Sequence, residues 1–224
     1  MRLATFSIVA KDRKSADFGG ASATAAPCVG AFLPNVLEGV GAIASQAWVN
    51  VNLGHHGIDL IRNGMGVRIA LEALLAEDEG RDRRQVIGVD RRSGFGYTGR
   101  DCTDAKGHLV GHDFAVAGNI LTDISVLDAM ANAFKNSKAE FSQRLLDSLV
   151  AGQDAGGDSR GKMSAVLRVS SSKPRLYHDL RVDLSDDPIT ELARLHGECV
   201  ARQQEYGDDE DGEELRVRVA RLSR

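Results

Sequence analysis

The stretch TFSIVAK at residues 5–11 decides the fold class of this chain. Within it, polar Thr5 and Ser7 alternate with apolar Phe6 and Ile8. A period of two is typical of a β-strand that buries one face. The stretch therefore predicts a core strand, and the remaining elements are placed outward from it.

The composition limits the class of protein. The chain has 224 residues, 28 basic and 32 acidic side chains, and a net charge of -4. This size fits one domain with a sizeable core, and the 42% hydrophobic content argues against a disordered or fibrous chain. The sequence pI near 5.9 lacks the basic footprint of a nucleic-acid binder. The sequence has neither a long apolar run nor a signal peptide. We therefore expect a cytoplasmic protein that binds neither membrane nor nucleic acid.

Cysteines and histidines give little sign of a metal or a disulfide. Cys28, Cys102 and Cys199 are odd in number and far apart, which indicates reduced thiols. The adjacent histidines His55 and His56 would point their imidazoles apart, whereas GHLVGH at 107–112 could bring two imidazoles together. Solvated or hydrogen-bonded histidines are the simpler reading of both motifs, so no metal and no cofactor is predicted.

The order of the remaining elements indicates antiparallel sheets. Strand-like segments occur in groups and helical segments mostly in pairs. The expected order is strands at 19–26 and 39–47, helices after 54 and from 67, strands at 85–90, 95–98 and 114–117, helices at 127–134 and 141–149, strands at 163–169 and 178–184, and a helix at 189–206. Grouped elements of this kind predict a layered α+β domain over 1–206, with helices on the outer faces of the sheets.

The last segment, GDDEDGEELRVRVARLSR at 207–224, differs in composition from the rest. It places six acidic residues before four arginines. Such charge runs are typical of solvated tails, and the alternation near 215–222 also allows an edge strand. Both interpretations stay open.

One glycine-rich segment suggests a polar site. In GGDSRGKMSA at 156–165, Asp158, Arg160, Lys162 and Ser164 lie beside three glycines. A loop shaped around a polar ligand is one interpretation. A glycine-capped helix end that carries a solvated ion pair into the next strand is the other. The chain has no Walker loop, GxSxG elbow, HExxH helix or dinucleotide fingerprint to support other mechanisms.

Several motifs taken together resemble a known family. They are TFSIVAKD at 5–12, GVGAIASQAWVN at 39–50, YTGRDC at 97–102, GH at 107–108, FAVAGNIL at 114–121, GGDSRGKMSA at 156–165 and DLRVDLSDDPITELARL at 179–195. In this order they resemble the bacterial family called domain of unknown function 1028, which is placed in the N-terminal-nucleophile (Ntn) hydrolase superfamily. The resemblance implies a four-layer αββα sandwich of antiparallel sheets and an amidohydrolase whose first mature residue is the nucleophile.

The resemblance also suggests roles for individual residues. Thr5 would be the nucleophile, activated by its own freed α-amine, whose ordinary pKa lies near 8. Hypotheses for the other residues follow from their chemistry: Ser7 orients the proton path, Asn119 stabilises the oxyanion, Asp158 and Lys162 tune the nucleophile, Arg160 holds a substrate carboxylate, and Gln46 and Ser164 contribute to substrate binding. The expected substrate is a small molecule with an amide bond.

Residues 1–4 separate two hypotheses. MRLA precedes Thr5, so a free amine on Thr5 requires that these four residues be removed. If they are removed, the chain is expected to be an amidohydrolase of the Ntn type. If they remain, Thr5 is capped, and a non-catalytic ligand-binding or assembly protein is expected. Self-association into a homo-oligomer is predicted in either case, because sandwich folds offer flat surfaces.

Overall fold

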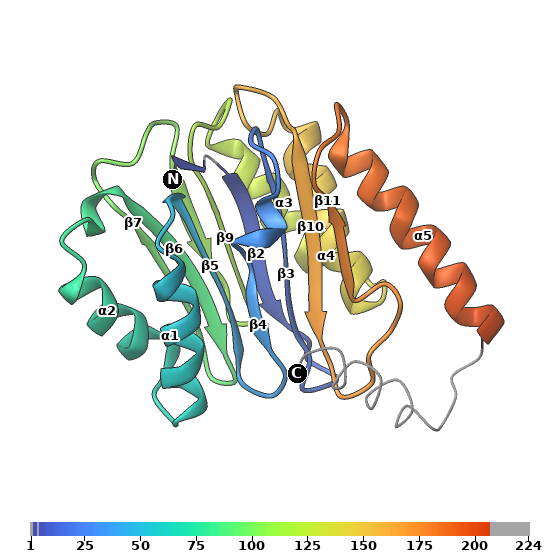
Figure 1. The fold of residues 1–224 in the computed structure, drawn as a ribbon, viewed down its shortest axis with the longest axis horizontal. Coiled ribbons are helices and arrows are strands. Elements are labelled where there is room, and N and C mark those ends of the chain that lie inside the picture. The colour runs from blue at the N-terminus through green and yellow to red at the C-terminus, as the bar shows by residue number, and fades with distance from the viewer. Residues whose placement is uncertain (1, 4, 207–224) are drawn as a thin grey trace.

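The computed structural model describes residues 2–3 and 5–206. These residues form a mixed α+β fold with two antiparallel sheets and five helices (Figure 1). Sheet A has the order β1-β5-β6-β7, and β4 also pairs with β5. Its strands are β1 (Arg2–Leu3), β4 (Asn35–Leu37), β5 (Gly41–Trp48), β6 (Arg84–Asp90) and β7 (Gly94–Thr98).

Sheet B has six strands in the order β11-β10-β3-β2-β9-β8. They are β2 (Thr5–Lys11), β3 (Phe18–Thr24), β8 (Gly107–Val110), β9 (Phe114–Gly118), β10 (Ser164–Ser170) and β11 (Asp179–Val182). β2 lies inside the sheet, since it pairs with both β3 and β9. The stretch that decided the fold class is therefore a central strand.

The predicted alternation along β2 is confirmed, but both faces of the strand are buried rather than one, because each packs against another layer. Phe6 and Ile8 contact the helices that cover sheet B, whereas Val9 packs toward sheet A. Thr5 and Ser7 share the face of Val9 because side chains alternate along a strand. The apolar face of β2 thus supports the outer helices, and its polar face looks into the space between the sheets.

Each sheet carries helices on its outer face (Figure 1). One apolar cluster joins sheet A to α1 and α2, and a second joins sheet B to α3, α4 and α5. A third cluster lies between the sheets. The helices are α1 (Val51–Arg62), α2 (Val67–Glu77), α3 (Ser125–Asn136), α4 (Phe141–Asp154) and α5 (Pro188–Tyr206).

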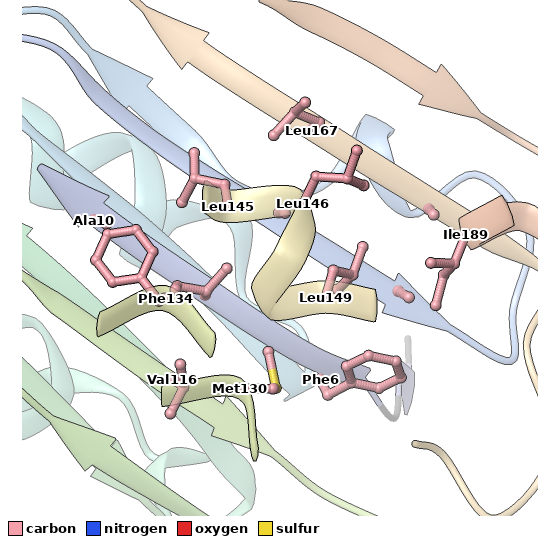
Figure 2. Packing of buried hydrophobic residues seen from close by; sticks show 14 of the residues in the cluster. Phe6, Ala10, Val116, Met130, Phe134, Leu145, Leu146, Leu149, Leu167 and Ile189 are labelled. Carbon is pink, nitrogen blue, oxygen red and sulfur yellow. The ribbon is translucent and has the colours of Figure 1, made fainter. Parts of the chain in front are cut away.

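The cluster on the outer face of sheet B shows how helix and sheet periods combine (Figure 2). Phe6 of β2, Met130 of α3 and Leu149 of α4 are buried together. Gly152 of α4 lets the helix approach closely, because a Cβ there would lie 2.7 Å from Cγ of Met130. Helical spacing of apolar residues on α3 and α4 therefore places both helices on β2.

The space between the sheets changes character along β2. Toward Lys11 it is apolar, with Val9 in the same cluster as Ile87 and Val89. Toward Thr5 the buried side chains are polar: Thr5, Ser7, Ser22, Thr24, Gln46, Gln85, Asn119 and Ser164 are all at most 2% exposed. This buried polar end is the candidate site.

The differences from the sequence prediction are short elements and boundaries. β1, β4 and β8 have two to four residues, too few for a period of two to be recognised. Met65 was expected on the helix that became α1, but this helix ends at Arg62, and Gly64 follows with a φ of +96°. Positive φ favours glycine and ends a helix.

The predicted tail or edge strand at 207–224 lies outside the described residues. Within the described part of the chain, no helix combines the length and the apolar character that a membrane span requires.

Candidate functional site

Thr5 lies where the chain passes from one sheet to the other. It begins β2 and is fully buried. Just upstream, Arg2 and Leu3 pair with Trp48 and Ala47 in sheet A. Because Ala4 precedes Thr5 in the sequence, the Thr5 nitrogen belongs to a peptide bond in the intact chain. The free amine that the nucleophile hypothesis requires is absent while residues 1–4 remain.

Three hydroxyl side chains lie in register at this end of sheet B. Thr5 pairs with Thr24 of β3, which in turn pairs with Ser164 of β10. Ser164 Oγ donates a hydrogen bond to the carbonyl of Ala26 at 2.6 Å and accepts one from the Val29 N–H at 3.0 Å. Ser164, predicted to bind substrate, therefore holds the loop after β3 in the intact chain.

The carbonyl of Thr5 is held from two sides. It accepts hydrogen bonds from the Asn119 backbone N–H at 3.2 Å and from Gln46 Nε2 at 3.1 Å. Gln46 Oε1 in turn accepts the Ser7 hydroxyl at 2.5 Å. Four of the predicted site residues, Thr5, Ser7, Gln46 and Asn119, are thus joined in one hydrogen-bond network.

Gln85 lies at the centre of this network and was not predicted. Its Oε1 accepts hydrogen bonds from Gln46 Nε2 at 2.8 Å and from Asn119 Nδ2 at 2.9 Å. Its Nε2 donates to the carbonyls of Gly107 and Gly118, both at 2.9 Å. Gln85 therefore links β5 and β6 of sheet A to β8 and β9 of sheet B.

A sequence signal for Gln85 does exist. In QVIGVD the glutamine shares a strand face with Ile87 and Val89, which are fully buried. A polar side chain in phase with buried apolar ones needs hydrogen-bond partners inside the protein. Gln46 has the same relationship to Ala42 and Ala44 in GAIASQAW.

The network ends in one titratable group. Gln85 Nε2 also lies 3.0 Å from Thr98 Oγ1, which contacts His108 Nδ1 at 2.8 Å. Burial lowers the pKa of His108, so the imidazole is neutral at pH 7. The other side chains of this network are amides and hydroxyls, none of which acts as a base at neutral pH.

The histidine motifs do not form a metal centre within the described ranges. His108 belongs to the network above, whereas His112 contacts Asp113 at 2.7 Å. On α1, His55 and His56 are exposed, and His55 contacts Asn35. Residues 2–3 and 5–206 contain no group of three or more potential metal ligands.

Asp158 and Arg160 form a closed ion pair beside the hydroxyl row. The Asp158 side chain is completely buried, and Arg160 donates to both of its oxygens, at 3.1 Å and 2.8 Å. Asp158 Oδ2 also accepts a 3.4 Å hydrogen bond from the N–H of Ala25, next to Thr24. The glycine-rich loop is therefore fixed against the strand that neighbours Thr5, and Arg160 is already paired with a carboxylate.

Lys162 points toward helix α5. Its ammonium lies 2.6 Å from Asp187, just before that helix. The hydrogen bond from Lys162 is the largest cause of the lowered pKa of Asp187. Lys162 was predicted to act on the nucleophile Thr5. In the intact chain its partner is Asp187 instead.

The fold and the site together define a mixed α+β protein with a buried polar network at the start of its central strand. The model of the family of unknown function DUF1028 matches residues 5–192, so the chain belongs to that family. The crystal structure of protein SPO2555 from Silicibacter pomeroyi, also assigned to DUF1028, is similar, with 33% sequence identity and a TM-score of 0.80. The similarity covers 87% of this chain and 88% of that chain. No curated protein sequence matches this chain.

Proposed function

We propose that this protein is an Ntn-type amidohydrolase, built as a four-layer αββα sandwich, that cleaves an amide bond in a small metabolite. Thr5 is its proposed nucleophile. The observation that carries the proposal is the position of Thr5: fully buried at the start of the central strand, with its carbonyl bound by Gln46 and Asn119. The family match also begins at Thr5 and leaves residues 1–4 outside.

The proposed chemistry requires removal of residues 1–4. The freed α-amine of Thr5, with an ordinary pKa near 8, would take the proton of its own hydroxyl. The hydroxyl oxygen would attack the substrate carbonyl, the leaving amine would accept the proton, and water would hydrolyse the acyl-enzyme. The groups bonded to the Thr5 carbonyl are the side-chain amide of Gln46 and the backbone N–H of Asn119, neither of which is a base at neutral pH, and this favours the amine in this role.

Two network residues have a supporting part in the proposal. Asn119 Nδ2 uses one hydrogen on Gln85 Oε1, and its second hydrogen has no partner within residues 2–3 and 5–206. That hydrogen is the proposed oxyanion donor. Ser7, bound to Gln46, would orient the proton path. In this scheme Asp158 supports the neighbouring loop. Arg160 could bind a substrate carboxylate only if its guanidinium contacted Asp158 and the substrate at the same time.

One observation favours the non-catalytic alternative. Arg2 and Leu3 form a strand with β5, so the intact chain has an ordered partner for the segment that caps Thr5. If this segment stays in place, the protein is a ligand-binding or assembly module with the same polar interior. The cytoplasmic location and the self-association expected from the sequence apply to both alternatives.

Intact mass and N-terminal sequencing of untagged protein, followed by treatment with a β-lactone electrophile, test the proposal. We expect a chain that begins at Thr5 and a covalent adduct on Thr5. Thr5→Ala should abolish the adduct, whereas Thr24→Ala, which removes the neighbouring buried hydroxyl, should retain it. A chain that keeps residues 1–4 and forms no adduct would overturn the hydrolase proposal and favour the alternative.

A further inference from the structure

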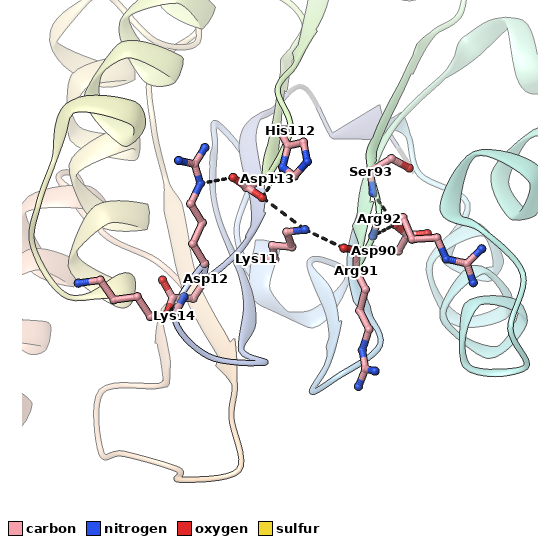
Figure 3. A network of polar contacts seen from close by, with 10 residues as sticks. Lys11, Asp12, Lys14, Asp90, Arg91, Arg92, Ser93, His112 and Asp113 are labelled. Atoms are coloured by element: carbon pink, nitrogen blue, oxygen red, sulfur yellow. Dashed lines mark hydrogen bonds and ion pairs between the residues drawn. The ribbon is translucent and has the colours of Figure 1, made fainter.

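A second polar region lies at the other end of β2, around Lys11 (Figure 3). It borders a pocket of about 640 Å³, a volume within the usual range for small-molecule sites. Its lining includes Lys11, Ala16, Phe18, Arg91, His112 and Asp113. Lys11 is the last of the seven residues of β2, so it lies roughly 20 Å along the strand from Thr5.

One carboxylate that lines the pocket, Asp113, already has cationic partners within the protein. Asp113 is buried and contacts Lys11 Nζ at 3.4 Å, the guanidinium of Arg13 and His112 Nδ1 at 2.7 Å. Burial raises the pKa of Asp113, but the hydrogen bonds from His112, Arg13 and Lys11 outweigh it and hold the pKa below its ordinary value. Asp113 is therefore ionised at neutral pH and has two cationic partners.

The other two carboxylates are also engaged. Asp12 lies 3.6 Å from Arg144. Asp90, beside the pocket, accepts hydrogen bonds from the backbone N–H groups of Val67, Arg92 and Ser93 at 2.9, 2.7 and 2.7 Å. The oxygens of Asp90 are therefore taken up by backbone amides, and within the described residues Asp90 makes no ion pair with Arg91 or Arg92.

Arg91 lines the pocket with a guanidinium that no carboxylate pairs within the described residues. Within residues 2–3 and 5–206, its guanidinium makes no hydrogen bond or ion pair, although Lys11 Nζ donates to its backbone carbonyl at 2.7 Å. Gly39, with a φ of +65°, makes room for it, since a Cβ there would lie 2.9 Å from Arg91 Nη2. Arg91 also lines an adjoining pocket of about 370 Å³. Arg91 thus lines both pockets, and Figure 3 shows its side chain pointing away from Lys11 and Asp113.

We propose that this pocket binds a small organic oxyanion, a phosphate or a carboxylate attached to an apolar body. The Arg91 fork matches the paired oxygens of either group. The Lys11 ammonium has three hydrogens, of which the contacts to Arg91 and Asp113 use two. Ala16 and Phe18 supply an apolar lining for the ligand body. This binding site is separate from Thr5 and independent of the proposed hydrolase.

Isothermal titration calorimetry with phenyl phosphate, benzoate, inorganic phosphate and phenol tests this site. We expect saturable binding of at least one of the two aromatic anions, tighter than that of inorganic phosphate or phenol. Phenyl phosphate and benzoate distinguish a phosphate from a carboxylate ligand. Amide shifts in ¹⁵N spectra of the full chain should concentrate at Lys11, Gly39, Arg91 and His112.

Matched variants make the test specific. Arg91→Gln removes one charge-assisted contact and should weaken binding about tenfold. Arg92→Gln, which lines only the smaller pocket, should leave the affinity within twofold, and Thr5→Ala should leave it unchanged. Lack of saturable binding to both aromatic anions, an unchanged affinity in Arg91→Gln, or shifts centred elsewhere would each overturn the proposal.

Discussion

The side-chain amide of Gln46 in sheet A donates a hydrogen bond of 3.1 Å to the main-chain carbonyl of Thr5 in sheet B. This contact crosses the space between the sheets at its polar end. Because Gln46 also accepts the Ser7 hydroxyl, two consecutive inward-facing residues of β2 depend on one side chain. The position of Thr5 is therefore coupled to sheet A as well as to its own sheet.

Truncation of Gln85 should be costly. Gln85→Ala leaves the amides of Gln46 and Asn119 and two backbone carbonyls with fewer partners inside the protein. We expect the free energy of unfolding to fall by about 3 kcal/mol, measured by urea denaturation. Gln143→Ala, which removes only a contact to Asp147 four residues along α4, should cost less than about 0.5 kcal/mol. Equal losses in both variants would contradict the central role of Gln85.

Two helical glycines should respond in opposite directions to alanine. In Gly152→Ala the new Cβ would lie 2.7 Å from Met130 and 3.2 Å from Phe6, and we expect a loss of about 1–3 kcal/mol. In Gly197→Ala nothing lies within 4 Å, so the gain in helix propensity should stabilise α5 by about 0.5–1 kcal/mol. Thermal unfolding of the two variants would show this, and destabilisation by Gly197→Ala would refute the expected gain.

His196 should make stability depend on pH near neutrality. It is buried, and its Nε2 lies 2.7 Å from the hydroxyl of Ser142. Burial lowers the pKa of His196 below its ordinary 6.5, and the carboxylates of Glu140 and Asp147 only partly oppose this. Below pH 6.5 the unfolded chain then binds more protons, so this part of the stability is lost as the pH falls toward the folded pKa.

Replacement of His196 isolates this effect. The free energy of unfolding of His196→Gln, measured between pH 7.5 and 5, should fall less steeply than that of the unchanged protein. His56→Gln, at an exposed position on α1, should retain the original slope. A slope that His196→Gln leaves unaltered would show that this imidazole does not carry the dependence.

Asp78 should stabilise the protein above pH 4. Burial raises its pKa, but hydrogen bonds from Arg84, Asn50 and the Gly80 N–H outweigh this and bring the pKa from 3.8 to about 2. Its contribution is complete above 3.8 and is lost as the pH falls through about 2. Asp78→Asn should therefore cost about 2 kcal/mol at pH 7. Chemical denaturation should show this loss, whereas Asp59→Asn, an exposed carboxylate, should cost less than about 0.5 kcal/mol.

Local patterns were sufficient for most of the fold. The alternation in β2 assigned its two faces correctly, and apolar spacing located all five helices, with the start of α5 predicted to within one residue. β1 could not be found, since two residues carry no period and only their pairing with β5 makes them a strand. The predicted strand at 178–184 shortened to Asp179–Val182.

The site was less accessible to sequence reasoning, because its contacts are between residues far apart in the chain. Thr5, Ser7 and Asn119 were chosen from the motifs, and the structure brings them together. The role of Gln85 depends on which faces of the two sheets meet, which no local pattern specifies. Lys162 was predicted to tune the nucleophile and Arg160 to hold a substrate carboxylate, but Lys162 pairs with Asp187 and Arg160 with Asp158.

The pairing of Leu3 with Ala47 in one sheet and of Thr5 with Thr24 in the other has a mechanical consequence. The intact N-terminal segment is a covalent tether between the two sheets. A chain that begins at Thr5 lacks this tether, and the contact of Gln46 with Thr5 then remains as a link between the start of β2 and sheet A. The sheets stay connected by the segments after β3 and after β7, so removal of residues 1–4 should change the freedom of Thr5 relative to sheet A rather than the alignment of the two sheets.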